Sequence, residues 1–285
     1  MYGFSFAAGV IRSRFIRGAG WRACTTIAAV ALSAGAARAA VFATRVVDYT
    51  PGAGIDAKYQ DPNGALGKPE ADTTFGILTP FNATFAGGQM TGVGQGGQLT
   101  LQLSDPVPAN GRTIGIHAAV GLTDYNYPNG QAGDGSAAQP LAYTSPRQAT
   151  LSVSDDGAHW VSLGDLTFDI PTNFYDQGVT TPGYQTTPGT HEADFAKPFT
   201  GALNDFAGKD WAGVLSVLDG SAGGTWIDLS ATGLSQVDFV RFTEPNAGET
   251  VYVDAVSAVP EPVTGGLIVV AAIALTRRRT VHRDC

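Results

Sequence analysis

Short stretches in which apolar and polar residues alternate dominate the middle of the chain. Between Leu99 and Leu103 three leucines fall on one face of a strand, and Thr100 and Gln102 fall on the other. This alternation is typical of an antiparallel sheet with one packed side and one wet side. Gly, Pro, Asn and Asp separate the stretches, as turns require. The pattern predicts strands at residues 43–49, 98–103, 113–117, 149–154, 160–163, 226–229, 236–243 and 251–257. The expected fold is therefore an all-β, antiparallel, jelly-roll-like β-sandwich.

One helix is expected within the sandwich. Apolar residues recur at positions i, i+3, i+4 and i+7 from Trp211 to Leu218, and Gly220 follows as a stop. This spacing places them on one face of a helix over residues 209–218. We expect that face to pack across one end of the sandwich.

The clearest hairpin runs from Leu151 to Leu163. Asp156-Gly157 between the two apolar runs predicts a tight turn. The pattern V-x-V-S-x-D-G-x-x-W resembles hairpins of discoidin-like and other galactose-binding-like jelly rolls, which implies that fold. It also partly matches the Asp-box, except that Val153 stands where that motif has Ser.

The N-terminal region has the layout of a secretory signal peptide over residues 1–39. A basic region through Arg22 leads into an apolar stretch and then into Ala37-Arg38-Ala39, the small-x-small pattern that signal peptidase accepts. We expect cleavage after Ala39 or after Ala40. The alternative is an N-terminal membrane anchor, but the apolar stretch is shorter than the roughly 20 residues that span a bilayer.

The C-terminal region carries the most specific pattern in the sequence. Pro260-Glu261-Pro262 precedes an apolar run over residues 263–276, and Arg277, Arg278 and Arg279 follow it. The prolines interrupt helix and sheet. A helix over the run reaches only about 21 Å, against a hydrocarbon core of about 30 Å. The arginines favour the cytoplasmic side. The pattern predicts a short transmembrane helix.

This end of the chain resembles the bacterial PEP-CTERM sorting signal over roughly its last 27 residues. The resemblance implies processing by exosortase, a membrane-embedded transpeptidase-like enzyme. By position, Pro260, Glu261 and Pro262 would be its recognition residues, with Arg277 to Arg279 as the basic cluster. The alternative is an ordinary tail anchor. The middle of the chain is also similar to ectodomains that carry such signals. We therefore expect a signal peptide at 1–39, an ectodomain at 40–259 and a sorting segment at 260–285.

Charge and cysteine content agree with an exported ectodomain. Of the 17 Lys and Arg, 5 precede Ala40 and 4 follow Thr276, which leaves 8 bases against 24 of the 25 acids and a net charge of −16. Such a surface disfavours nucleic-acid binding, because it repels phosphate. Cys24 and Cys285 lie at the two ends, so the ectodomain contains no disulfide.

No catalytic motif is recognised in the ectodomain, and we expect no catalytic residues. The glycines from Gly92 to Gly97 satisfy G-x-G-x-x-G, but a strand follows where a dinucleotide site needs a helix. His117, His159 and His191 are isolated from one another in sequence. Acids are so numerous that a pair of carboxylates carries little information.

A structural calcium ion is the one cofactor that the residues suggest. Oxygen-rich stretches contain Asp56, Asp61 and Asp124, and hard cations prefer carboxylate and carbonyl oxygens. The alternative is that these residues form turns.

Two long segments, 121–146 and 171–199, interrupt the rhythm of strands and make the candidate ligand surface. Long loops in a compact domain are usually functional or disordered. The candidate binding residues are their tyrosines, Tyr125, Tyr127, Tyr143, Tyr175 and Tyr184. Such rings stack on sugars, which points to extracellular polysaccharide as a partner. The alternative is that the aromatic residues fix the loops to the sandwich.

These observations predict an exported protein, anchored in the inner membrane as a precursor and then located at the cell surface or in the extracellular matrix. Signal peptidase and an exosortase-like enzyme are its expected processing partners. We expect a structural, adhesive or carbohydrate-binding module. The alternative is a secreted hydrolase on a jelly-roll scaffold.

Overall fold

The predicted strands are confirmed in a computed structural model that describes residues 40–143, 147–243 and 250–260. The predicted signal peptide (1–39) and the residues of the predicted sorting segment after Pro260 lie outside these ranges. Each predicted strand has a counterpart, and three short strands, β2, β7 and β8, were not expected. The strands are β1 (Val41–Thr50), β2 (Thr91–Val93), β3 (Gln98–Pro108), β4 (Arg112–Ala118), β5 (Arg147–Ser154), β6 (Val161–Phe168), β7 (Tyr175–Gln177), β8 (His191–Glu192), β9 (Thr225–Asp228), β10 (Gln236–Thr243) and β11 (Val251–Ala258).

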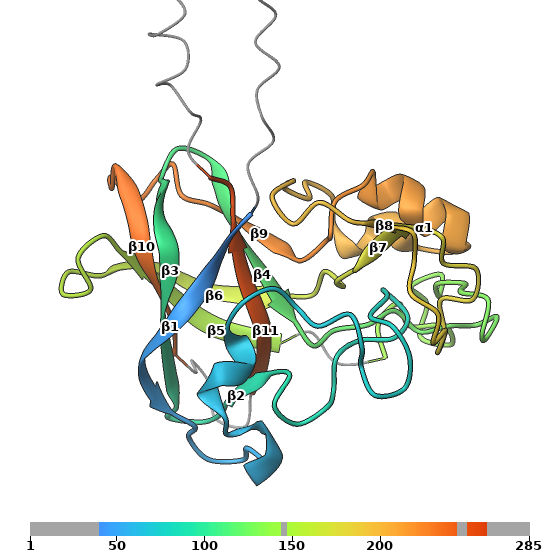
Figure 1. Ribbon diagram of the computed structural model, residues 1–285, viewed down its shortest axis with the longest axis horizontal. Helices are drawn as coiled ribbons and strands as arrows, with labels where there is room; N and C mark the ends of the chain where they lie inside the picture. The colour runs from blue at the N-terminus through green and yellow to red at the C-terminus, as the bar shows by residue number, and fades with distance from the viewer. Residues whose placement is uncertain (1–39, 144–146, 244–249, 261–285) are drawn as a thin grey trace, which may run out of the picture. The chain divides into compact units, whose positions relative to one another are not determined.

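Nine of the strands form one antiparallel sheet that turns back on itself (Figure 1). Its order is β6-β5-β10-β3-β1-β11-β4-β9, with β2 added beside β11, while β7 and β8 form a separate pair. Strand β1 joins the two halves, because Val41 and Phe42 pair with β11 whereas the residues from Ala43 onward pair with β3. The result is an all-β fold with a sandwich-like or nearly closed barrel-like sheet.

The main hydrophobic core lies between the two halves of the sheet. The alternating apolar residues of β3, β5 and β10 meet those of β4 and β11, and Phe168 packs edge-on against Phe242 with ring centroids 5.9 Å apart. Each such fully buried side chain contributes about 1.5–3 kcal/mol. Fully buried examples are Leu99, Leu101, Ile114, Ile116, Leu151, Val240 and Val253.

The first and last strands of the sheet place their outermost residues side by side. Val41, the first residue of β1, pairs with Ala258, the last residue of β11 (Figure 1). Tyr252 lies near the other end of β11, where it pairs with Gly92 of β2. The start of β11, around Tyr252, therefore lies at the opposite end of the strand from the pair formed by Val41 and Ala258.

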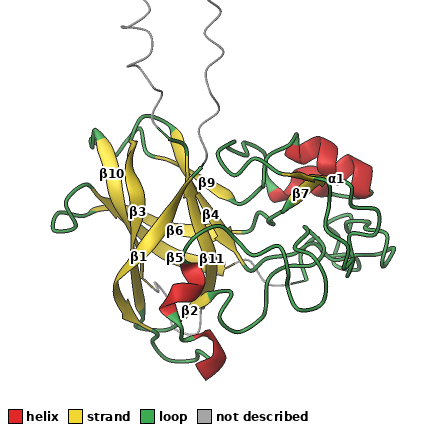
Figure 2. Cartoon of the chain, in the orientation of Figure 1, coloured by secondary structure: helices red, strands yellow, loops and turns green. Residues whose placement is uncertain are grey.

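Beside the sheet lies a region of loops that carries α1 (Trp211–Leu218), while two short helical turns lie next to β2 (Figure 2). The predicted helix is confirmed as α1; the Asp210 carboxylate caps it by accepting from Gly213 N at 2.9 Å. Val214 and Leu218 of α1 join a second buried cluster with Phe206. Three 3-10 turns are η1 (Ala57–Tyr59), η2 (Pro62–Ala65) and η3 (Leu203–Phe206). Within the described ranges no helix is long and apolar enough to cross a membrane.

The hairpin between β5 and β6 is present, but its loop is longer than the expected tight turn. Val153 pairs with Val161, so the residues between them form the connection. Only Gly157 of the Asp-Gly pair has positive φ, at 73°. The Asp156 carboxylate instead accepts hydrogen bonds from Ala158 N and His159 N, each at 2.8 Å. These side-chain bonds replace the backbone geometry of a two-residue turn.

The glycines from Gly92 to Gly97 serve close packing of the backbone. They span β2 and the turn before β3, as expected from the strand that follows them. A Cβ at Gly94 would lie 2.1 Å from the Ala53 carbonyl oxygen, and one at Gly97 would lie 2.5 Å from that of Pro51. Only glycine permits this approach of two backbone segments.

His117 of β4 is a buried structural histidine. Its ring nitrogens lie 3.1 Å from Thr172 Oγ1 and 3.0 Å from Ser257 Oγ, and the ring packs on Phe195. Burial lowers the pKa of His117 to about 3, because the charged form would lose its hydration.

The folded protein should lose stability as the pH falls, because His117 must stay neutral. The unfolded chain takes up a proton below the ordinary pKa of 6.5, whereas the folded chain resists protonation down to about 3. Stability falls by about 1.4 kcal/mol per pH unit in this window. We expect the advantage of wild type over His117→Gln in urea unfolding to shrink by about 2 kcal/mol from about pH 7 to about pH 5. A constant difference would contradict this assignment.

Candidate functional site

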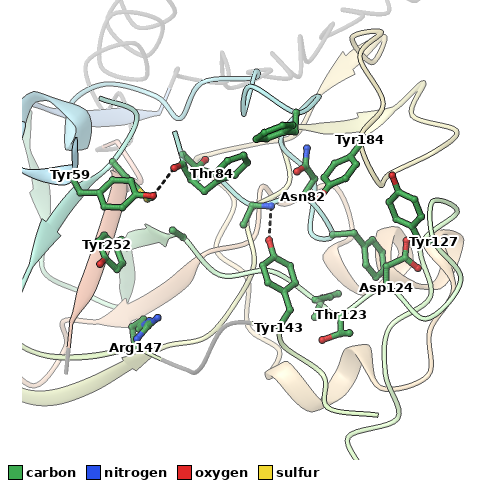
Figure 3. Close-up of a pocket in the computed structure, with 17 residues that line it drawn as sticks. Tyr59, Asn82, Thr84, Thr123, Asp124, Tyr127, Tyr143, Arg147, Tyr184 and Tyr252 are labelled. Carbon is green, nitrogen blue, oxygen red and sulfur yellow. Dashed lines mark hydrogen bonds between the residues drawn. The ribbon is translucent and has the colours of Figure 1, made fainter. Parts of the chain in front are cut away.

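An open cavity of about 860 Å³ lies where several loops meet the start of β11, around Tyr252 (Figure 3). Its size falls in the range of small-ligand pockets. The residues that line it come from distant parts of the chain: the η1 turn, residues 75–90 and 119–127, Tyr143, Arg147, Tyr184 and Tyr252. We call this cavity the aromatic cleft.

Exposed aromatic side chains gather at this cleft. Among the described residues, seven large hydrophobic side chains are exposed; Val47 and Tyr125 lie elsewhere, and the other five line the cleft. Those five are Phe75, Phe85, Tyr127, Tyr143 and Tyr184. Such a concentration of exposed apolar surface usually marks a binding site.

Four of these rings form a continuous row. Phe85 stacks on Phe75 with centroids 4.9 Å apart and planes at 17°. Phe75 lies 6.2 Å from Tyr184, which meets Tyr127 edge-on at 5.5 Å. Phe75, Tyr127 and Tyr184 are 55%, 60% and 53% exposed, so more than half of each side chain remains open to a ligand.

Backbone strain accompanies two members of the row. Tyr184 has φ 58°, and Thr74, next to Phe75, has φ 77°. Bulky and β-branched residues rarely adopt this left-handed region. The other such non-glycine residue among those described is Asp219, which ends α1. Strain of this kind is often kept at functional sites, where the surroundings hold it in place.

Two tyrosine hydroxyls in the cleft have complementary hydrogen-bonding roles. Tyr59 donates to the Phe85 carbonyl oxygen at 2.8 Å, which leaves its oxygen free to accept. Tyr143 accepts from Ala83 N at 2.9 Å, which leaves its proton free to donate (Figure 3). The hydroxyl end of Tyr143 packs tightly against Gly121, and burial raises its pKa. The cleft thus offers both acceptors and donors to a polar ligand.

A buried acid supports the cleft from behind. Thr84, which lines the cleft, donates its hydroxyl proton to Asp254 Oδ2 at 2.7 Å. Within the described ranges Asp254 Oδ1 has no hydrogen-bond partner, and the residue is 3% exposed. Burial raises the Asp254 pKa well above its usual range, with a further contribution from the charge of Glu70. Asp254 thus holds the hydroxyl of the buried Thr84 in place behind the cleft.

The structure brings together three of the five tyrosines proposed from the sequence. Tyr127, Tyr143 and Tyr184 line the cleft, whereas Tyr125 and Tyr175 do not. Tyr125 donates to the Ala138 carbonyl oxygen at 3.3 Å, and Tyr175 packs on Phe174 with centroids 4.8 Å apart.

The alternative role of the loop aromatics, fixing the loops, fits Tyr125 and Tyr175 among the five tyrosines, and it applies to two phenylalanines as well. Phe174 and Phe195 are only 4% and 5% exposed and form a third buried cluster with Leu78. The two long segments therefore use one set of rings for packing and another for the cleft.

Sequence reasoning did not single out most of the other residues that line the cleft, among them Tyr59, Phe75, Phe85, Arg147 and Tyr252. Tyr252 carried a usable signal, because in Val251-Tyr252-Val253 the alternation turns the tyrosine away from the core. Phe75 and Phe85 lie in a segment without periodicity, and nothing in the sequence placed them beside Tyr184.

The three aspartates proposed for calcium each cap a turn of their own. Asp56 Oδ1 accepts from Lys58 N at 3.3 Å, and Asp61 Oδ1 accepts from Asn63 N at 3.0 Å. Asp124 accepts from three backbone N–H groups of its loop. In the part of the chain that the structure describes, no three acidic, histidine or cysteine side chains cluster as metal ligands would.

The remaining histidines also serve local contacts. His159 Nδ1 lies 2.7 Å from Asp156 Oδ2, and His191 Nδ1 lies 2.7 Å from Asp176 Oδ1. His117 is buried in the sheet, so the three histidines act separately.

Replacing Asp254 by Asn should change how stability depends on pH, in the direction opposite to His117. The unfolded chain releases the Asp254 proton above the ordinary pKa of 3.8, whereas the folded chain retains it to higher pH. Wild type therefore loses stability as the pH rises, by about 1.4 kcal/mol per unit within this window. Asn carries no such proton and still accepts from Thr84.

We expect Asp254→Asn to gain stability relative to wild type in urea unfolding from about pH 4 to about pH 6. Two curves that stay parallel over this range would contradict the buried neutral carboxyl.

Comparison with known proteins identifies no relative of this chain. No protein-family model matches the chain, and no curated protein matches it either.

Proposed function

We propose that this chain is an exported surface or matrix protein whose ectodomain binds carbohydrate in the aromatic cleft. The observation that carries the proposal is the row of exposed rings from Phe85 through Phe75 and Tyr184 to Tyr127. Isolated exposed rings are common, but a continuous row at the wall of a cavity is not.

The chemistry of a sugar matches that of the cleft. A pyranose ring has weakly polar C–H faces, which pack on the electron-rich faces of aromatic rings. Its hydroxyl groups both donate and accept hydrogen bonds. The Tyr59 oxygen is available as an acceptor, and the Tyr143 hydroxyl is available as a donor.

The arrangement of carboxylates favours binding over hydrolysis. Glycoside hydrolases use two carboxyl groups on either side of the scissile bond, roughly 5 to 9.5 Å apart. Among the described residues, the one carboxylate in the lining of the cleft is that of Asp124. Its oxygens accept from the backbone N–H groups of Asn126, Gly130 and Gln131 at 2.9, 3.1 and 2.9 Å. Asp124 is thus engaged in shaping its loop.

We further propose that the sheet is a jelly roll of the galactose-binding-like kind. Support comes from the folded antiparallel sheet, its single main core and the hairpin between β5 and β6. Loops at one end of such a sheet provide a binding surface on a rigid scaffold.

We also propose that the C-terminal segment acts as a PEP-CTERM-like sorting signal. The support is its sequence, because Glu261 and all that follows lie outside the described residues. The ectodomain itself ends next to the motif: Val259 N still donates to the Thr113 carbonyl oxygen at 2.8 Å, and Pro260 follows. A processing enzyme could therefore act there without disturbing the sheet.

Removing single rings from the row should weaken glycan binding. Because each ring contributes roughly 1 kcal/mol or more of contact, we expect Tyr184→Ala and Tyr127→Ala each to lower the affinity about tenfold. Tyr125→Ala is the matched control, since Tyr125 is similarly exposed but does not line the cleft. Binding to a glycan array, followed by calorimetry on the best ligand, measures the effect. Equal loss in all three variants would show that the cleft is not the site.

Changing the motif should block processing. With a C-terminal tag, we expect Glu261→Ala to remain in the membrane at full length, while wild type loses the tag. Glu249→Ala, an acid before the motif, is the control. Immunoblots of membrane and medium fractions distinguish the two outcomes, and normal release of Glu261→Ala would refute the sorting role.

A further inference from the structure

The two charged residues that line the aromatic cleft lie at opposite ends of it. Figure 3 shows Arg147 beside Tyr252 at one end and Asp124 beside Tyr127 at the other. Asp124 is occupied by the backbone of its own loop. The guanidinium of Arg147 is therefore the charged group in the lining that is available to a ligand.

A second cation, Lys58, lies outside the lining of the cleft and is connected to Arg147 through two aromatic rings. Arg147 Cζ lies 6.0 Å from the centroid of the Tyr252 ring, and that ring meets Tyr59 edge-on at 5.0 Å. Lys58 Nζ in turn lies 4.6 Å from the centroid of the Tyr59 ring. We call these four residues, Lys58, Tyr59, Arg147 and Tyr252, the basic end of the cleft.

The cations of the basic end are not engaged by the acids near them. Four ion pairs occur in the described ranges, and neither Lys58 nor Arg147 takes part in any of them. Asp56, close to Lys58 along the chain, uses Oδ1 to accept from the Lys58 backbone N–H. This placement contrasts with residues 40–259 as a whole, in which acids outnumber bases 23 to 8.

We propose that the basic end selects an anionic sugar, so that the ligand is an acidic polysaccharide bearing carboxylate or sulfate groups. The inference rests on the proposed role of the cleft in binding glycans. The anionic group would lie against Arg147, with Lys58 adding positive charge from outside the lining, and the ring faces would stack along Tyr184, Phe75 and Phe85. Arginine suits this role, because its planar guanidinium binds carboxylate or sulfate oxygens through two parallel hydrogen bonds.

The net negative charge of the ectodomain does not prevent this selection. At physiological ionic strength charges are screened beyond about 8 Å, so most acids on the surface act weakly on a ligand in the cleft. A direct contact with Arg147 is screened much less. The contact with Arg147 therefore decides the preference for an anionic sugar. Added salt should weaken that preference.

Polygalacturonate and its methyl-esterified form test the inference, because the two polymers share a backbone and differ in charge. We expect wild type to bind polygalacturonate about tenfold more tightly than the ester. We expect Arg147→Gln to remove this difference and Lys58→Gln to reduce it. Arg147→Lys retains the charge and should keep part of the preference. Arg112→Gln is the control. Arg112, the first residue of β4, does not line the cleft, so this variant should behave like wild type.

A sulfated galactan identifies the source of the anionic group. Arg147-dependent binding of the galactan alone would support an anionic sugar carrying sulfate, and Arg147-dependent binding of polygalacturonate would support a uronic acid. Equal affinity for polygalacturonate and its ester, unchanged in Arg147→Gln, would overturn the inference. If that shared affinity still fell in Tyr184→Ala, the cleft would remain a glycan site without acid selectivity. No binding of any polymer would refute the proposed function as well.

Discussion

The pairing of one strand with two different neighbours holds this fold together. Strand β1 pairs with β11 at its first two residues and with β3 along the rest, and its register shifts between Ala43 and Arg45 and again between Val46 and Asp48. Such irregularities bend a strand and increase its twist. The bend lets one continuous sheet enclose the main core on both sides. The aromatic cleft at the start of β11 depends on that closure.

The aromatic cleft is stable because its supports are buried while its surface is not. Phe206 and Trp226 belong to the second buried cluster, and Phe174 and Phe195 belong to the third. These clusters attach the loops to the sheet, so that rings such as Tyr184 can stay exposed in a strained conformation. A loop without such attachment would relax the strain and lose the alignment of the row.

Much of this architecture was predictable because its determinants are local. Period-two alternation identified the long strands, and the spacing of Trp211 and Leu218 identified α1. The segment 121–146 was correctly separated from the strands, whereas the segment 171–199 contains the short pair β7 and β8, and three tyrosines of the two segments do line the cleft. Phe75, Phe85 and Arg147 were not identified, since their significance lies in contacts with segments far away in the sequence. The turns at Asp56, Asp61 and Asp124 show why composition alone left two interpretations open, a calcium site or a set of turns. A carboxylate oxygen can bind a metal ion or accept from a backbone N–H equally well.

The position of β11 has a mechanical consequence. Its last residue, Ala258, adjoins the exit of the chain, and Tyr252, near its start, lies in the cleft. A ligand held in the cleft and a tail held at the cell surface would pull on opposite ends of this one strand. The hydrogen bonds to β1, β2 and β4 run across that direction. They would bear the load together in shear instead of opening one after another, and that geometry suits a tether that must hold under flow.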